Sequence, residues 1–141
     1  IVAVEEILPE QSNQYGVVSL EREHGPLNLI KGIIEKPLPE NAPSNLGVTG
    51  RYILNPSIFE CLKKISRGSG GEWQLTDAIA EQLKIEQVYA YQYLGQRYDC
   101  GSKLGYLKAT FEFGLRHPEV GNHFKEYILT SIGFLAGRKP E

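Results

Sequence analysis

The stretch GIIEKP at residues 32–37 ends an apolar segment with an acid, a base and a proline. The Glu35 carboxylate can only accept hydrogen bonds, whereas the Lys36 ammonium group donates them and suits anionic oxygens. Pro37 favours an extended backbone at Lys36, which limits the directions open to its side chain. Adjacent residues of a regular strand face opposite sides, so both groups reach one ligand only if the strand bends or ends there. Without a ligand, the pair is two solvated charges at a strand end.

Asp99 and the glycines of segment 46–54 are further candidates. Asp99 precedes Ser102, a potential helix cap, at the point where a strand gives way to a helix. A carboxylate there can bind a hard cation or accept hydrogen bonds from helix N-terminal N–H groups, and the local pattern favours helix entry. Gly47 and Gly50 weaken the strand that contains them, which indicates close approach of a ligand or another backbone.

Two other features lack the spacing of a phosphate-binding or catalytic motif. The glycine-rich segment RGSGGEW at residues 67–73 matches neither common phosphate-loop pattern, so it is predicted to be a surface loop. The histidines, His24, His117 and His123, have no serine or cysteine at a spacing typical of nucleophilic catalysis.

Composition excludes several classes of protein. The 141 residues carry a formal net charge of −2, with no basic stripe for nucleic acid. No apolar run approaches the roughly 20 residues needed to span a bilayer, so no membrane partner is expected. Cys61 and Cys100 are too few for a disulfide framework, which favours a reduced, cytoplasmic protein. A strand-like pattern that begins at Ile1 without a methionine leads us to expect part of a larger fold.

Periodicity predicts strands first, then helices mixed with one more strand. Segments 15–23 and 27–36 are predicted to form an antiparallel hairpin. Asn55 and Pro56 mark the start of a helix. The predicted strands are 1–6, 15–23, 27–36, 46–54 and 88–95; the predicted helices are 57–65, 75–83, 103–117, with the apolar stripe Leu104, Leu107, Phe111 and Leu115, and one around Phe124. This order indicates an α/β or α+β half-domain.

Four segments occur in order along the chain: IIEKP, APSNLGVTGRYIL, GGEWQLTDAI and YDCGSKLGYLKA. Together they resemble the bacterial UTP–glucose-1-phosphate uridylyltransferases (UDP-glucose pyrophosphorylases), over residues 1–129 and over the C-terminal half of that family only. The resemblance implies an α/β fold, the sugar-phosphate-binding part of a Rossmann-like nucleotidyltransferase with a mixed sheet and C-terminal helices. Residues 1–102 would be the sugar-binding half of the domain, and residues 103–141 C-terminal helices for oligomerisation and a tail.

The resemblance also implies a reaction, in which UTP and glucose 1-phosphate give UDP-glucose and pyrophosphate. In this family the glutamate of the EKP motif accepts hydrogen bonds from glucose hydroxyls and the lysine contacts the phosphates. Carried over, these residues are Glu35 and Lys36, with Lys36 as the catalytic group. Gly16 matches a glycine whose backbone lies against the sugar, and Gly50 is expected to allow the same close approach. Asp99 matches an aspartate that holds Mg²⁺ in related enzymes.

Other readings stay open at this point. The family's N-terminal half, which binds UTP, is absent from these residues, so we expect no turnover from this chain alone. Another sugar-phosphate nucleotidyltransferase, such as a thymidylyltransferase, is one alternative. A non-catalytic oligomerisation fragment is another, because the C-terminal helices are rich in apolar residues and a cut sheet should expose an edge or a face. A homo-oligomer is expected in either case.

Overall fold

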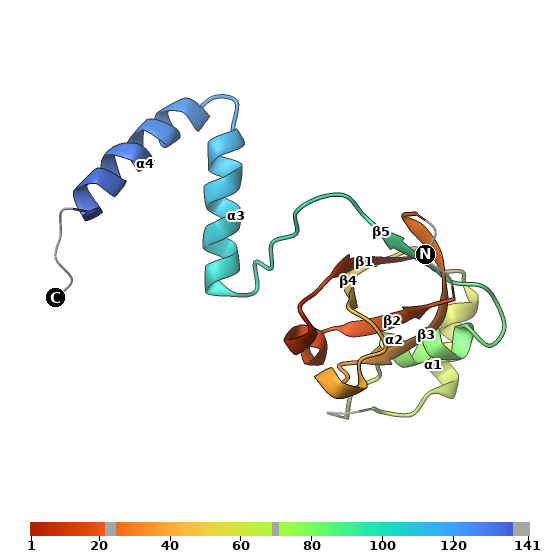
Figure 1. Cartoon of the computed structure of the whole chain (residues 1–141). Helices are drawn as coiled ribbons and strands as arrows, with labels where there is room; N and C mark the ends of the chain where they lie inside the picture. The colour runs from red at the N-terminus through yellow and green to blue at the C-terminus, as the bar shows by residue number, and fades with distance from the viewer. Residues whose placement is uncertain (22–24, 69–70, 137–141) are drawn as a thin grey trace. The chain divides into compact units, whose positions relative to one another are not determined.

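The computed structural model describes residues 1–21, 25–68 and 71–136. The chain divides into two compact units, Ile1–Leu94 and Gly95–Glu141, and each is described by itself (Figure 1). Among the described residues, the first unit contains all the strands, and the second contains the two longest helices. The functional division predicted after residue 102 remains a prediction.

Five strands of the first unit close into a ring in the order β1–β4–β2–β3–β5, with β5 pairing back to β1 (Figure 1). The β1–β5 pair is parallel and the other pairs are antiparallel, which confirms the predicted mixed sheet and the predicted hairpin of β2 and β3. Each of these strands has a neighbour on both sides, so of the expected exposed edge or face, the edge is absent from the described strands. The strands are β1 (Val2–Glu6), β2 (Gly16–Leu20), β3 (Leu27–Glu35), β4 (Leu46–Tyr52) and β5 (Tyr89–Gln92).

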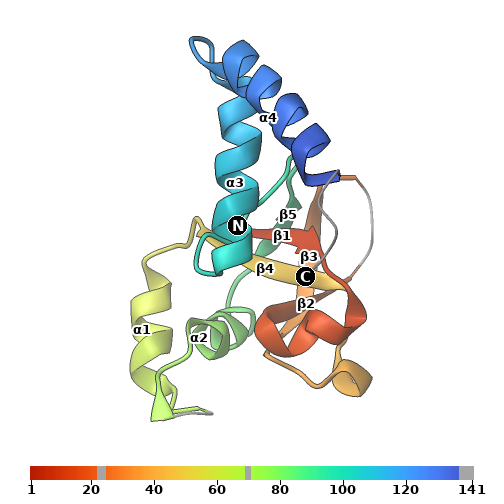
Figure 2. The ribbon, with the colours of Figure 1, turned by 90° about the vertical axis from the view of Figure 1, so that its left-hand side faces the viewer.

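Two helices, α1 (Ser57–Lys64) and α2 (Leu75–Gln82), pack side by side, and α2 contacts β3 (Figure 2). Both are amphipathic, and their apolar stripes complete the core formed by the inner faces of the strands. Short 3₁₀ segments, η1 (Pro9–Gln14) and η2 (Pro39–Asn41), follow β1 and β3. The most deeply buried apolar side chains include Val2, Val4, Val18, Cys61, Ala78, Ile79 and Ala90.

The second unit holds α3 (Lys103–Arg116) and α4 (Gly121–Ala136), joined by a short turn (Figure 1). Ser102 caps α3 as predicted, since its hydroxyl accepts a hydrogen bond of 3.0 Å from the Gly105 N–H. The helix α4 continues to Ala136, beyond the point where the sequence shows a clear pattern. Within the described residues, no helix combines the length and apolarity that crossing a bilayer requires.

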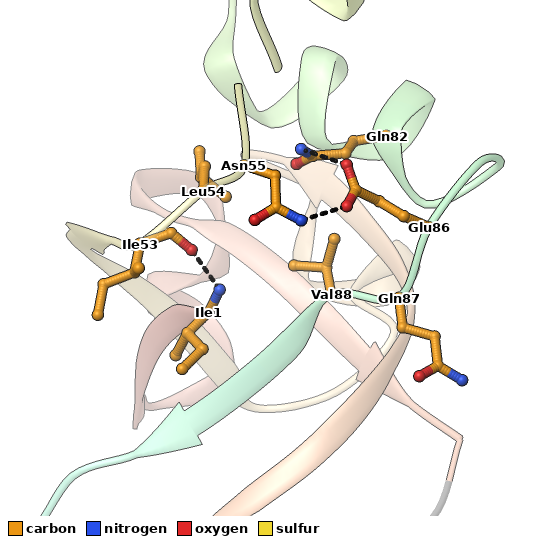
Figure 3. A pocket seen from close by; sticks show the side chains of 8 residues that line it. All are labelled: Ile1, Ile53, Leu54, Asn55, Gln82, Glu86, Gln87 and Val88. Atoms are coloured by element: carbon orange, nitrogen blue, oxygen red, sulfur yellow. Dashed lines mark hydrogen bonds between the residues drawn. The ribbon is translucent and has the colours of Figure 1, made fainter. Parts of the chain in front are cut away.

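The Glu86 carboxylate forms hydrogen bonds with residues at the start of α1 and the end of α2 (Figure 3). It accepts hydrogen bonds from the Asn55 amide, from the Ser57 hydroxyl and, at 3.0 Å, from the Gln82 amide. Asn55 does not cap α1 through its side chain, since the helix begins without a side-chain cap hydrogen bond. The Asn55 amide nitrogen donates to Glu86. The carboxylate links the start of α1 to the end of α2, just before β5 begins.

We expect Glu86→Gln to lower the free energy of unfolding near neutral pH, because a carboxylate accepts these hydrogen bonds more strongly than an amide does. The bonds from Ser57 and Asn55 lower the pKa of Glu86. A group with a lowered folded pKa stabilises the fold above its unfolded pKa, roughly 4.3, and that contribution is lost as the pH falls through the folded pKa. Urea unfolding at about pH 7 and about pH 3 should show a smaller deficit of the variant at the lower pH.

Glu60 provides a matched control. Its carboxylate pairs with Lys63 on the same exposed helical turn, so Glu60→Gln should have a smaller effect that high salt reduces further. A deficit of equal size for Glu86→Gln at both pH values would contradict the stabilising role of the charged carboxylate.

Candidate functional site

The candidate site lies where β2 begins, β3 ends and α2 begins. Gly16 and Glu35 face each other as partners in the β2–β3 pair. Beside them is a pocket of about 580 Å³ lined by Ile33, Ile34, Glu35, Lys36, Glu72, Gln74 and Asp77. The glycine-rich segment, predicted to be only a surface loop, thus supplies one lining residue, Glu72, and Gln74 follows it directly. Its Arg67 guanidinium lies 4.6 Å from the centre of the Trp73 ring.

Lys36 has a left-handed backbone, with φ of 45°. The sequence rule for residues before proline predicts an extended backbone here, and that prediction is wrong. A non-glycine residue in this conformation is uncommon and costs about 1–2 kcal/mol, so the surrounding structure must hold it. The strand therefore ends at Glu35, and the chain turns at Lys36.

Two hydrogen bonds hold this turn, one with Ser12 of η1 and one with Tyr15, the residue after η1. The Lys36 N–H donates to the Tyr15 carbonyl at 2.9 Å. Ser12 is only 1% exposed. Its hydroxyl donates to the Pro37 carbonyl at 3.0 Å. The backbone is thus fixed on both sides of the Lys36 side chain, which explains how a locally unfavourable conformation persists.

The turn brings the Glu35 and Lys36 side chains to the same side of the strand. The Lys36 Nζ lies 3.8 Å from the Glu35 Oε1, a distance that a regular extended strand would not give to adjacent residues. The Glu35 side chain is 21% exposed and that of Lys36 is 57% exposed. The geometric condition for both groups to reach one ligand is therefore met, and neither charge is so buried that it is inaccessible.

Thr76, on the first turn of α2, is a site residue that the sequence reasoning missed. Its hydroxyl donates a hydrogen bond of 2.6 Å to the Glu35 Oε2. Gly16 lies against both groups: a β-carbon there would come within 3.1 Å of the Thr76 hydroxyl and 3.2 Å of the Glu35 Oε2. The signal in the sequence was a polar residue on the apolar face of the helix, three positions before Ile79.

The charges around the pocket are unevenly divided. Three carboxylates, those of Glu35, Glu72 and Asp77, line it with a single lysine, Lys36. Burial, and then the negative charge of Glu35, raises the pKa of the Tyr52 phenol, so Tyr52 remains protonated at neutral pH. Such a lining suits a ligand that is rich in hydroxyl donors and carries its anionic group on the side of Lys36.

The backbone conformation at Gly50 favours glycine at this position. Its φ is 77°, in the left-handed region that glycine adopts at little cost. It lies in a bulge of β4, where the register with β1 shifts between the pairs of Val2 and Val4. A β-carbon at Gly50 would meet no atom within 4 Å. Its expected approach to a sugar remains a prediction.

Asp99 belongs to the second unit and acts there at a helix entry. Its Oδ1 accepts a hydrogen bond of 3.1 Å from the Gly101 N–H, and its carbonyl accepts one of 3.1 Å from the Ser102 hydroxyl. In the part of the chain that the structure describes, no group of three histidine, cysteine or acidic side chains is arranged to hold a metal ion. Metal binding by Asp99 remains a prediction.

Comparison with known proteins identifies relatives that match most of this chain. The chain is 44% identical over 128 residues to the UTP–glucose-1-phosphate uridylyltransferase YngB of Bacillus subtilis (strain 168), which covers 91% of this chain and 43% of that protein. A crystal structure of UDP-glucose pyrophosphorylase complexed with UDP-glucose matches with a TM-score of 0.75 and 46% identity, over 79% of this chain and 42% of the other. The UDP-glucose pyrophosphorylase of Acinetobacter baumannii matches with a TM-score of 0.78 and 42% identity, over 92% and 44%.

These matches confirm the resemblance carried by the four sequence segments. The chain spans less than half the length of the relatives it matches. The sequence profile of the nucleotidyl transferase family matches residues 2–113, most of this chain, and the α/β structure with its mixed sheet agrees with it. This chain therefore belongs to the nucleotidyl transferase family.

Proposed function

We propose that this chain is the sugar-phosphate-binding part of a UTP–glucose-1-phosphate uridylyltransferase. The observation that carries the proposal is the Glu35–Lys36 pair, held 3.8 Å apart at the edge of the pocket by a left-handed turn. The names of the relatives supply the substrates, UTP and glucose 1-phosphate. Because the chain covers 43% of such a relative, we propose that it has no turnover alone and that UTP is bound by the rest of the enzyme.

In the proposed reaction, a phosphate oxygen of glucose 1-phosphate attacks the α-phosphorus of UTP in line, and pyrophosphate leaves. Such chemistry depends on positioning and on offsetting negative charge rather than on a covalent nucleophile. Lys36 contacts the phosphates with a compact positive charge. Glu35, which has only acceptors, takes hydrogen bonds from the glucose hydroxyls. The Gly16 backbone lies against the sugar ring, and Gly50 serves the same close approach.

Magnesium and Asp99 form the metal part of the proposal. Mg²⁺ usually binds one or two carboxylates together with phosphate oxygens and water, so a single exposed carboxylate such as Asp99 suits it. When bound, the ion would neutralise charge on the phosphates. Asp99 would supply one oxygen ligand, with its other oxygen held by the Gly101 N–H.

An activity assay of the full-length enzyme with a panel of nucleoside triphosphates tests the function. We expect UTP to be preferred with glucose 1-phosphate, and chelation of divalent cations to abolish turnover. Asp99→Asn should raise the Mg²⁺ concentration needed for half-maximal rate. A strong preference for dTTP would favour the alternative function, a thymidylyltransferase, whose nucleotide would likewise be chosen outside this chain.

Lys36→Ala should lower kcat of the full-length enzyme by roughly a hundredfold, because losing one contact to developing charge costs about 3 kcal/mol. The KM for UTP should change little. Alanine keeps the β-carbon, so the left-handed backbone is strained equally in both proteins. Lys31→Ala is the matched control, since Lys31 is an exposed lysine of the same strand, and it should retain turnover. Near-normal turnover of Lys36→Ala would show that Lys36 takes no part in the reaction.

We also propose that the enzyme is a cytoplasmic homo-oligomer that associates through α3 and α4. The predicted apolar stripe of α3 lies open: Leu104 and Leu107 are each 63% exposed and Phe111 is 42% exposed. Side chains of this kind are usually covered when they gather on one helical face. A second copy of the chain offers the same apolar stripe, so the two can cover each other symmetrically.

Light scattering of the full-length enzyme in the micromolar range should give a mass above that of one chain. Leu104→Ser combined with Leu107→Ser should lower the mass towards that of a monomer. Ile53→Ser is the control, because Ile53 is 73% exposed in the first unit and should leave the mass unchanged. A wild-type monomer throughout this range would contradict the proposed assembly.

A further inference from the structure

The Glu35 carboxylate has its two oxygens assigned to different partners. Oε2 accepts the 2.6 Å hydrogen bond from the Thr76 hydroxyl, whereas Oε1 is the oxygen nearest the Lys36 ammonium group. A glutamate side chain has three rotatable bonds, and a partly exposed one otherwise samples several rotamers. The bond from Thr76 therefore fixes the orientation of the carboxylate, with Oε1 on the side of Lys36 and the pocket.

Thr76 is itself held rigidly. It is only 5% exposed, and the neighbouring residues of α2, Ala78 and Ile79, are completely buried. A β-branched side chain on a helix has restricted χ1 freedom, so the direction of the hydroxyl is set by the packing of the helix. Hydrogen bonds to a charged acceptor are stronger than neutral ones, which favours donation to Glu35 over competition from water.

Backbone also closes the space around Oε2 and the Thr76 hydroxyl. Gly16 faces Glu35 across the β2–β3 pair, and even a β-carbon there would crowd both Oε2 and the Thr76 hydroxyl. Glu35 is thus confined between β2 and α2, with Oε1 left on the side of Lys36.

We propose that Thr76 is a positioning residue that sets affinity for the sugar by fixing Glu35. Helix α2 acts through this one hydroxyl, and Thr76 need not touch the substrate. The inference rests on the proposed function, in which Glu35 accepts hydrogen bonds from glucose hydroxyls, and it deepens that function by naming what orients the acceptor.

Kinetics of the full-length enzyme test this role with Thr76→Val, which keeps the shape and removes the hydroxyl, and Thr76→Ser, which keeps the hydroxyl. Thr76→Val should raise the KM for glucose 1-phosphate about tenfold and leave the KM for UTP unchanged, as expected for a lost hydrogen bond to a charged group. Thr76→Ser should stay within about twofold of wild type. Thr76→Ala serves as a second variant if the valine protein does not fold.

Thr49→Val is the matched control, because the Thr49 hydroxyl donates to the Ala3 carbonyl at 3.2 Å and not to Glu35. It removes a threonine hydroxyl from β4 and should leave the KM for glucose 1-phosphate unchanged. In a Glu35→Gln background, Thr76→Val should add little to the KM, since the two residues act as one unit.

Crystal structures of the wild type and Thr76→Val separate this inference from the proposed function. The Glu35 side chain should change rotamer in the variant. An unmoved Glu35 with an unchanged KM overturns the role of Thr76 while the function stands. A wild-type enzyme that does not use glucose 1-phosphate overturns the function instead, and the Glu35 rotamer still decides whether Thr76 positions it.

Discussion

The left-handed turn at Lys36 is the constraint on which the candidate site depends. Without it, adjacent residues of β3 would point to opposite sides and no single ligand could contact both charges. The conformation costs about 1–2 kcal/mol, and hydrogen bonds from the Lys36 N–H to Tyr15 and from Ser12 to Pro37 offset that cost. The segment around η1 therefore shapes the site without lining the pocket, and the strain resides at the residue proposed to act on phosphate.

The charged groups that line the pocket are unevenly distributed, so the pocket has an acidic part and a single basic group. Carboxylates of Glu35, Glu72 and Asp77 face one lysine, so an anion is attracted at only one place and repelled elsewhere. A sugar phosphate has the same polarity, with hydroxyls at one end and anionic oxygens at the other. Under the proposed function, this match is the reason that an acid and a base next to each other in the sequence are more useful here than two residues of like charge.

Local patterns predicted the elements but not the arrangements that depend on distant partners. Alternation in segment 15–36 predicted the hairpin of β2 and β3, and the Ser102 cap followed from its position before α3. The rule for residues before proline failed at Lys36 because Tyr15 and Ser12, far upstream, override the local preference.

Thr76 illustrates the same limit within the site. The sequence shows a hydroxyl on an apolar helical face, which signals a buried hydrogen bond, yet only the packing of α2 on β3 reveals Glu35 as its acceptor. Closure of the strand ring is equally non-local, since Val2 pairs with Ala90. The resemblance to a known family gave Glu35, Lys36 and Gly16 their expected roles, and the structure brings these three together.

The closed ring also determines when the pocket can exist during synthesis. Glu35 and Lys36 precede β5 in the chain, and β5, the last of the described strands, pairs with both β1 and β3. Until Gln92 has left the ribosome, both of those strands present unpaired backbone groups that invite contact with other chains. A nascent chain that stalls between α2 and β5 would thus be open along two strand edges, and chaperones would be needed most over that interval.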